Sequence, residues 1–280
     1  MRITVASGKG GTGKTTVAVN LALSLCEQLP IQFLDCDVEE PNAHIFLRPQ
    51  IDERRSVEKL LPRVDTDRCT GCGVCADLCQ FGAIAVLAGG TLVFDELCHG
   101  CGLCALACPE HAIREEPHEL GVVESGSSRG FPFARGVLNV GEAMATPIIH
   151  ELKRTVRAEG AILVDAPPGT GCPTIAALRG SDLALLVTEP TPFGLHDLQA
   201  AIAVARTLDV RTAVIINRDG IGDDRVERYC KGERIPILAK IPFDREIASA
   251  YAEGTPIVDS DPAWRSRYRE LFERIKEVIS

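Results

Sequence analysis

Two runs of cysteines hold the densest group of reactive side chains in this sequence. The first run, CTGCGVCADLCQFGAI, occupies residues 69–84, and the second, CHGCGLCALACPEHAI, occupies residues 98–113. Both have the spacing C-x2-C-x2-C-x3-C, with a glycine on each side of the second cysteine. Because spacing and flanking residues match at a fixed offset of 29 positions (98 − 69), the runs indicate a duplicated supersecondary unit.

Cysteines crowded onto one tight loop favour an iron–sulfur cubane over zinc, since structural zinc usually takes two ligand pairs a dozen or more residues apart. In the bacterial pattern C-x2-C-x2-C-x3-C-P, the last cysteine of each run ligates the cluster of the other run. The sequence therefore predicts two [4Fe–4S] clusters, with a single cluster or zinc as the alternative. The first cluster would be held by Cys69, Cys72, Cys75 and Cys108, and the second by Cys98, Cys101, Cys104 and Cys79.

The segment resembles a bacterial two-cluster ferredoxin over about 50 residues. It departs from that pattern at Gln80, where proline is expected, while Pro109 keeps the proline in the second run. Because this proline only shapes the turn after the ligand, we still expect both clusters.

The N-terminus carries a different chemistry. RITVASGKGGTGKTT reads as an apolar strand, a glycine-rich loop and the start of a helix, and Gly8-x4-Gly13-Lys14-Thr15 fits the P-loop template. Lys14 would reach the β- and γ-phosphates of ATP, and the Thr15 hydroxyl would bind Mg²⁺. The residues expected around the phosphates are Gly8, Gly10, Gly11, Thr12, Gly13, Lys14, Thr15 and Thr16.

A second lysine, Lys9, precedes Gly10-Gly11 in this loop. Taken alone, Lys9 would be interpreted as a solvated loop residue. The whole string KGGTGKT, however, resembles the deviant Walker A of the MinD/ParA/Mrp/nitrogenase-reductase group of ATPases. In that group the signature lysine crosses a two-fold interface to the partner's nucleotide, so the resemblance implies a catalytic role for Lys9 and an ATP-sandwich homodimer.

Two stretches that carry acids are similar to further motifs of this group. IQFLDCDVEEPN (31–42) resembles switch I, which implies that Asp37 orients the attacking water and that Asp35 lies near the metal. AILVDAPPGTG (161–171) ends a strand at Asp165, as in Walker B, and its Gly169 matches the residue that senses the γ-phosphate in the Mrp-type switch II. Singly, each acid would also fit a carboxylate that caps a loop at a strand end.

The adenine end of the site is implied in the same way. AVIINR (213–218) and PILAKIPFD (236–244) resemble the adenine-binding elements of the group. The resemblance implies that Asn217 reads the edge of the base and that Pro242 and Phe243 pack near the ring.

Alternating strands and helices predict an α/β fold with a mainly parallel sheet covered on both faces. Apolar strand patterns lie at 2–6, 31–35, 161–165, 183–188, 212–217 and 236–240, and helical patterns at 14–28, 142–158, 193–208, 222–231 and 262–279. We predict a discontinuous P-loop ATPase domain at 1–62 and 118–280, interrupted by an inserted α+β ferredoxin domain at 63–117.

Composition limits the partners. The net charge of −9 over 280 residues argues against a broad nucleic-acid face. No apolar run approaches the ~20 residues of a membrane span, and MRITVASGKGG is no signal peptide, so we expect a cytoplasmic protein. Residues 63–117 hold eight acids and three arginines, a local charge of −5 (3 − 8), which predicts a basic docking face on a redox partner.

Three functions fit these features. The first is a dimeric ATP-hydrolysing switch that couples nucleotide state to electron transfer through two [4Fe–4S] clusters to a partner protein. The second is an Mrp-like iron–sulfur cluster carrier or assembly factor, and the third is a MinD-like positioning ATPase with redox-sensing clusters. Eight cysteines in complete ligand sets favour the first, because a transferable cluster needs incomplete or exchangeable ligation.

Overall fold

A computed structural model describes residues 1–88, 90–156 and 160–280. Its strands are β1 (Arg2–Ala6), β2 (Ile31–Asp35), β3 (Gln50–Val64), β4 (Ile84–Leu87), β5 (Gly90–Val93), β6 (Ile113–Ser128), β7 (Phe131–Leu138), β8 (Ala161–Asp165), β9 (Leu183–Thr188), β10 (Arg211–Asp219) and β11 (Ile237–Pro242). Its helices are α1 (Lys14–Leu25), α2 (Ala43–Leu47), α3 (Val74–Leu78), α4 (Leu103–Ala107), α5 (Thr146–Lys153), α6 (Cys172–Leu178), α7 (Pro192–Thr207), α8 (Arg225–Glu233), α9 (Arg245–Ala252), α10 (Ile257–Ser260) and α11 (Pro262–Ile279).

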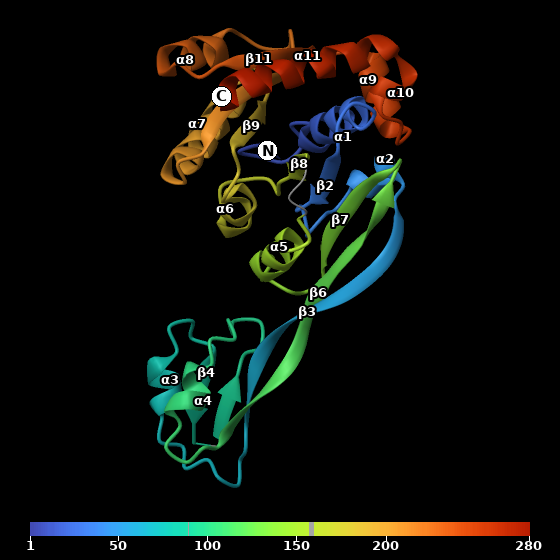
Figure 1. Cartoon of the computed structure of the whole chain (residues 1–280). Helices are drawn as coiled ribbons and strands as arrows, with labels where there is room; N and C mark the ends of the chain where they lie inside the picture. Colours follow the sequence, from blue (N-terminus) through green and yellow to red (C-terminus); the bar gives the residue numbers. More distant parts are fainter. Residues whose placement is uncertain (89, 157–159) are drawn as a thin grey trace.

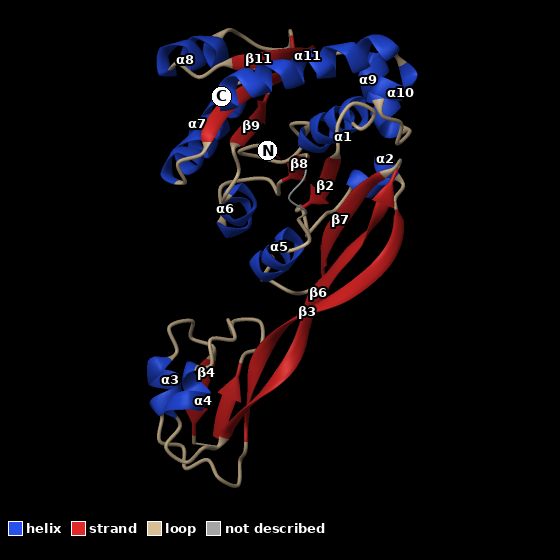
Figure 2. Ribbon diagram, viewed as in Figure 1, coloured by secondary structure: helices blue, strands red, loops and turns tan. Residues whose placement is uncertain are grey.

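One large sheet organises the molecule, with strand order β11-β10-β9-β1-β8-β2-β7-β6-β3. The strands from β11 to β7 pair in parallel, and only β6 and β3 at one edge are antiparallel. Helices α1 and α11 bury their apolar residues against one face, and α5, α6, α7 and α8 cover the other (Figure 2). The prediction of a mainly parallel α/β fold is confirmed.

The predicted elements of the ATPase region match the structure closely. All six predicted strands are present, with ends that differ by at most two residues. The helix predicted at 142–158 is shorter, since α5 covers only Thr146–Lys153, and residues 157 and 158 lie outside the described part of the chain.

Strands β3 and β6 form a long antiparallel ribbon that the sequence pattern did not predict. The ribbon is part of the sheet where β6 pairs with β7, and it then continues beyond the sheet to the cysteines (Figure 1). Residues 50–56 are exposed, so this part of β3 lacks the alternation of apolar and polar residues that marks a half-buried strand. The predicted domain boundaries, 62/63 and 117/118, fall within these two strands.

Residues 65–112, called the cysteine unit below, have an internal two-fold relation. At one end Val64 pairs with Ile113, and 29 residues along the chain Val93 pairs with Ile84. Just beyond the first pair, the N–H of Asp65 donates to the carbonyl of Ala112 at 2.7 Å. Just beyond the second, the N–H of Phe94 donates to the carbonyl of Ala83 at 2.8 Å. The duplicated sequence therefore folds into two similar halves, each completed by the other.

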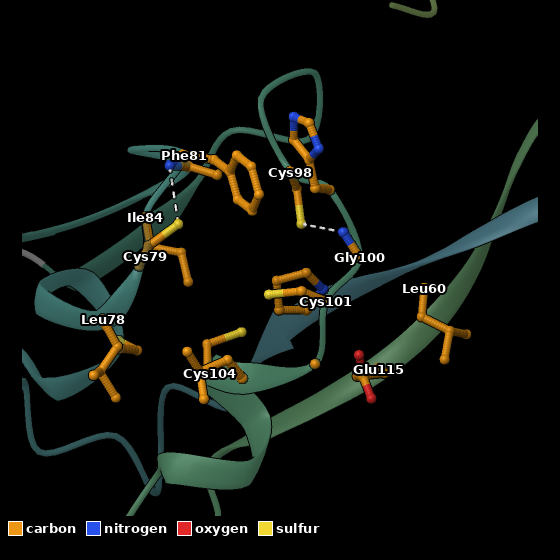
Figure 3. A pocket seen from close by; sticks show the side chains of 16 residues that line it. Leu60, Leu78, Cys79, Phe81, Ile84, Cys98, Gly100, Cys101, Cys104 and Glu115 are labelled. Carbon is orange, nitrogen blue, oxygen red and sulfur yellow. Dashed lines mark hydrogen bonds between the residues drawn. The ribbon is translucent and has the colours of Figure 1, made fainter. Parts of the chain in front are cut away.

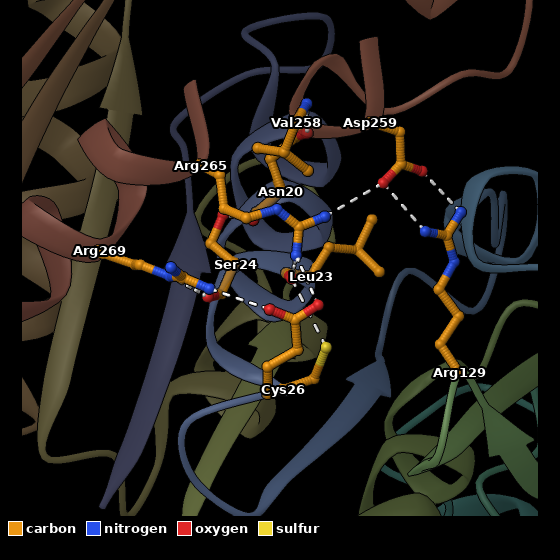
Figure 4. A network of polar contacts seen from close by, with 10 residues as sticks. Asn20, Leu23, Ser24, Cys26, Arg129, Val258, Asp259, Arg265 and Arg269 are labelled. Atoms are coloured by element: carbon orange, nitrogen blue, oxygen red, sulfur yellow. Dashed lines mark hydrogen bonds and ion pairs between the residues drawn. The ribbon is translucent and has the colours of Figure 1, made fainter. Parts of the chain in front are cut away.

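The C-terminal helix α11 is fixed to α1 through its apolar stripe and two arginines. Trp264, Tyr268, Leu271, Phe272 and Ile275 are buried in the core. On the neighbouring face, the guanidinium groups of Arg265 and Arg269 donate to two carbonyls in the last turn of α1. The acceptors are Leu23 and Ser24, both at 2.9 Å (Figure 4). The last carbonyls of a helix lack the usual backbone N–H partners, and among the described residues the Leu23 carbonyl otherwise accepts only from the thiol of the C-cap residue Cys26, at 3.5 Å, so α11 helps to cap α1. No helix among the described residues combines the length and apolar character needed to cross a membrane.

Candidate nucleotide site and cysteine cavities

The P-loop connects β1 to α1 and adopts a conformation that depends on its glycines. Gly11 and Gly13 have φ of 75° and 93°, a region that favours glycine. At Gly8 an added Cβ would lie 2.1 Å from the carbonyl oxygen of Asp197, so the loop could not pack against α7 with a larger residue. Lys14 begins α1, which places it where a helix N-terminus can bind a phosphate.

An open cleft of about 1340 Å³, its mouth included, extends from this loop to the C-terminal helices. Ten of the predicted residues line it: Gly10, Gly11, Gly13, Lys14, Thr15, Thr16, Asp37, Asn217, Pro242 and Phe243. Its far wall contains Ile247, Tyr251, Ile257, Trp264 and Tyr268, which the sequence did not assign to the site. Trp264 and Tyr268 belong to the apolar stripe of α11, and an apolar stripe in a sequence cannot show that one end of it faces a cleft. Gly8, Lys9, Thr12, Asp35, Asp165 and Gly169 lie outside this lining.

Two buried carboxylates lie side by side at the ends of adjacent strands. Asp35 of β2 pairs in register with Asp165 of β8, and neither is exposed. Burial raises the pKa of both carboxyls, and at Asp35 the charge of Asp165 adds to the rise. For Asp165 burial raises the pKa to about 7, although the Thr15 hydroxyl and Lys14 oppose the shift. The site is thus short of positive charge.

The two carboxylates differ in their hydrogen bonds. The oxygens of Asp35 accept from the backbone N–H groups of Asp37 and Ala43, at 3.2 and 3.1 Å, so this side chain shapes the loop after β2. Both oxygens of Asp165 are buried without a hydrogen bond of ordinary geometry, although the Thr15 hydroxyl is near enough to lower the pKa. A buried carboxylate beside a P-loop threonine fits Mg²⁺, which prefers oxygen ligands. Asp165 fits this role better than Asp35.

Asp37 lies at the rim of the cleft, where it is partly buried. Burial raises its pKa to about 6, Glu40 and Glu39 add to the rise, and Lys14 opposes it. A carboxyl with a pKa just below neutral is suited to accept a proton or to orient water near neutral pH.

Lys9 is held within its own chain by a residue that the sequence did not single out. Its ammonium lies 3.1 Å from a carboxylate oxygen of Glu189, just after β9, and the other oxygen accepts from Arg218. Glu189 is only 6% exposed, so its charge is neutralised by these two cations. The signal in the sequence was an acid at the end of an apolar strand, LALLVTEP.

Asn217 and Gly169 contact the P-loop region directly. The Asn217 amide donates to the carbonyl of Thr12 at 2.7 Å, and its oxygen accepts from the N–H of Arg218 at 2.9 Å. Gly169, with φ of 89°, donates its N–H to the carbonyl of Ser7 at 3.0 Å. Both predicted residues therefore lie close to the loop, and Asn217 also stabilises its shape.

The cysteine unit contains two small cavities, and each is lined by the four cysteines that the sequence assigns to one cluster. Cys69, Cys72, Cys75 and Cys108 line one cavity. Cys79, Cys98, Cys101 and Cys104 line the other, together with Cys75 (Figure 3). Cys79 and Cys108 each line the cavity of the opposite run. No three His, Cys, Asp or Glu side chains among the described residues are arranged to hold a single metal ion.

The environment of the sulfurs fits thiolate ligands. Backbone N–H groups four residues on donate to the Sγ atoms of Cys79 and Cys108, both at 3.3 Å, and the Gly100 N–H donates to Cys98 Sγ at 3.4 Å. The glycines around the second cysteine of each run all have positive φ: 71° and 84° in the first run, and 63° and 75° in the second. Such N–H groups stabilise negative charge on sulfur, as iron–sulfur sites require.

Comparison with known proteins identifies the group to which the chain is related. Residues 3–257 match the family model of the CobQ/CobB/MinD/ParA nucleotide binding domain. The chain belongs to this family. An uncharacterised protein of Methanocaldococcus jannaschii is 33% identical over 283 residues, which cover 100% of this chain and 98% of that protein. The aligned residues therefore span the cysteine unit.

More distant members carry functional names. The iron–sulfur cluster carrier protein of Pyrococcus horikoshii is 24% identical, with 98% of this chain and 85% of that protein covered. Among solved structures, the septum site-determining protein MinD of P. horikoshii, complexed with Mg-ADP, has a TM-score of 0.60 at 21% identity, covering 98% of this chain and 95% of its own. The cell division ATPase MinD of Pyrococcus furiosus has a TM-score of 0.61 at 21% identity, covering 99% and 98%. These structures share the family fold.

Proposed function

We propose that this protein is an ATPase whose nucleotide state is coupled to electron transfer by two [4Fe–4S] clusters bound in the cysteine unit. The observation that carries this proposal is that each of two cavities is lined by the four predicted ligands of one cluster. The clusters would supply one-electron transfer to a partner protein. Complete ligand sets favour a resident redox group over a cargo.

On the nucleotide side, the chain's own residues supply the parts that phosphoryl transfer needs. The N-terminus of α1 and Lys14 would bind the phosphates, and Thr15 with Asp165 would hold Mg²⁺. Asp37 would orient the attacking water from the rim of the cleft. Lys9 would leave Glu189 and reach the nucleotide of a second copy in an ATP-sandwich dimer.

A buried lysine on the ribbon links the cysteine unit to the ATPase domain. The Lys59 ammonium donates to the Asp95 carbonyl at 3.0 Å, and the same carbonyl accepts the N–H of Cys98 at 3.3 Å. The Lys59 ammonium also lies 3.5 Å from the carboxylate of Glu142, in the loop before α5. Movement of this loop would therefore shift Lys59 and, through the Asp95 carbonyl, the backbone of Cys98.

Helix α5 continues this link towards the stretch DAPPGTG. Lys153, in its last turn, donates to the carbonyls of Ala176, Ala177 and Arg179, at 2.8, 3.0 and 2.6 Å. These carbonyls end α6, which follows DAPPGTG directly. Changes at the γ-phosphate would reach α5 through α6, and the loop of Glu142 would pass them to the ribbon.

The proposal is tested by anaerobic titration of the isolated protein with ATP, ADP and a reductant, following the EPR of the clusters and the oligomeric state together. We expect two clusters per chain, with spectra and dimer fraction that change with the nucleotide. Clusters that are bound and do not respond to any nucleotide state would refute the coupling.

A second function, delivery of iron–sulfur clusters, has two observations in its favour. Several relatives at 23–26% identity are named iron–sulfur cluster carrier proteins. Cys72 and Cys101, the second cysteines of the two runs, are exposed, which would allow an acceptor to exchange with them. Transfer of clusters to an acceptor apoprotein in the same titration, with loss of iron from this chain, would favour delivery over electron transfer.

A further inference from the structure

Exposed apolar side chains surround one of the two cysteine cavities. Leu60, Leu78, Phe81 and Leu103, called the apolar rim below, are 38–44% exposed and line the cavity of Cys79, Cys98, Cys101 and Cys104 (Figure 3). None of the large hydrophobic side chains that are exposed in the described chain lines the other cavity. That cavity is bordered by smaller or polar residues such as Thr70, Thr91 and Glu110.

A further exposed leucine extends the apolar rim, and one ring contact joins the two cysteine runs beside it. Leu106, 84% exposed, lies three residues after Leu103 on α4, so the two side chains share one face of the helix. Phe81 of the first run stacks on His99 of the second, with ring centroids 3.7 Å apart and planes 6° apart. Single exposed leucines need no explanation, but several exposed apolar side chains around one cavity indicate a contact surface.

The charges around this surface have one sign. Glu115 is the only charged side chain among the described residues that line the cavity. Asp77, next to Leu78, is exposed as well. Two of the three arginines in residues 63–117, Arg63 and Arg114, are already paired with acids of the same region. The unpaired charge near the rim is therefore negative.

Building on the function proposed above, we infer that the apolar rim is the docking face for a redox protein that presents an apolar patch ringed by lysines or arginines. Charge complementarity selects a basic partner, and the apolar residues supply the contact once it has docked. The cluster that Cys79, Cys98, Cys101 and Cys104 would hold lies beside this face, so it would be the one to pass a single electron to the docked partner.

A basic c-type cytochrome is a suitable probe, since each ferric haem takes one electron from the dithionite-reduced protein and becomes ferrous. Stopped-flow rates would be compared for the wild type, Leu106→Gln and Glu115→Lys, each with iron and sulfide content measured. The matched controls are Leu92→Gln, an exposed leucine of the same unit that lines neither cavity, and Asp67→Lys, the same charge change two residues before Cys69, which lines the other cavity.

We expect Leu106→Gln and Glu115→Lys to lower the second-order rate by about fivefold or more, as for an interface residue of moderate weight, with unchanged rates in the controls. Only Glu115→Lys should also reduce the dependence of the rate on ionic strength.

Equal rates in all five proteins, or equal losses in the controls, would overturn the inference. Self-association that the same two variants abolish would instead assign the rim to a second copy. A wild type without two clusters, or unable to reduce the cytochrome, would refute the proposed function and this inference with it.

Discussion

At the scale of single residues, the protonation of the Asp165 carboxyl depends on its burial and on its neighbours Thr15 and Lys14. Burial raises its pKa in the native state to about 7, well above the ordinary value of 3.8 for an aspartate. At pH values between 3.8 and 7 the carboxyl keeps a proton in the native state that it has lost in the unfolded chain. The free energy of unfolding therefore falls as pH rises, by about 1.4 kcal/mol per pH unit from this group. This loss of stability is complete above pH 7. Mg²⁺ would relieve this cost by replacing the proton.

Asp165→Asn should therefore stabilise the metal-free protein at pH 8 by a few kcal/mol, on the order of 2–4. The gain should shrink towards pH 5 and vanish when Mg²⁺ and nucleotide are added to both proteins. Urea unfolding at several pH values measures it. A gain that stays constant from pH 5 to 8 would show that this carboxyl does not titrate in the native state.

Replacing Lys14 by Ala or Asp37 by Asn should abolish ATP turnover and leave the iron content unchanged. The cysteine unit is joined to the P-loop region through the ribbon, so loss of phosphate contacts does not touch the sulfurs. In the wild type, turnover should fall below pH 6, because burial raises the pKa of Asp37 to about 6 and protonation removes the carboxylate. Phosphate release and iron assays check this, and iron loss in either variant would contradict it.

Cys79→Ala should damage the cluster of Cys98, Cys101 and Cys104, because Cys79 lines their cavity. The matched change is Cys108→Ala, which should damage the cluster of the first run. EPR of each variant, compared with iron content, distinguishes the two sites. If Cys79→Ala disturbed only the cluster of its own run, the exchange of ligands between runs would be wrong.

At the scale of elements, helix α5 is seated on the sheet by two glycines. A Cβ at Gly136 of β7 would lie 2.6 Å from methyl groups of Ile148 and Val38, and one at Gly121 of β6 would lie 2.7 Å from Ile148. These strands leave room for the helix only because they lack side chains there. The same helix contacts the ribbon through Glu151, 3.5 Å from Arg55.

Gly136→Ala should lower the free energy of unfolding by about 1–3 kcal/mol, the usual cost of overpacking a core. Gly232→Ala is the control, because it lies in α8 with nothing within 4 Å of its added Cβ, and it should be neutral or slightly stabilising. Chemical unfolding followed by circular dichroism measures both. Equal stabilities would mean that α5 shifts easily on the sheet, and its role as a coupling element would fail.

The elements that the sequence predicts well are those with strong apolar runs. Strands β2 and β8 are buried throughout and β1 is buried after Arg2, so composition alone reveals them. The ribbon was missed because its strands are stabilised mainly by pairing with each other, and DERRS in β3 has no apolar face. Glu189 was missed because its role arises from Lys9 and Arg218, which lie far from it in the sequence.

At the scale of the whole molecule, dimerisation requires Lys9 to exchange partners. In this structure its ammonium pairs with Glu189 of its own chain, and the proposed dimer needs it at the nucleotide of the second copy. Lys9 is 33% accessible, but Glu189 is buried, so the carboxylate would have to keep its contact with Arg218 when Lys9 leaves.

Lys9→Ala should leave ATP binding nearly unchanged but abolish the ATP-dependent dimer and its turnover. Lys240→Ala is the control, since Lys240 pairs with Glu227 at the surface and lies outside the cleft. Sedimentation with ATP and with ADP, together with a nucleotide-binding assay, separates the two effects. A Lys9→Ala protein that still dimerises with ATP would exclude the sandwich arrangement.

The ribbon makes the cysteine unit the far end of a lever. Eight residues of β6, 113–120, precede those that pair with β7, and at about 3.4 Å per residue they span roughly 25 Å. A rotation of about 5° where the ribbon meets α5 would then displace the cysteines by about 2 Å, a simple consequence of this length. A displacement of that size is enough to open or close a contact between two proteins, so small rearrangements around the nucleotide would be magnified where the partner docks.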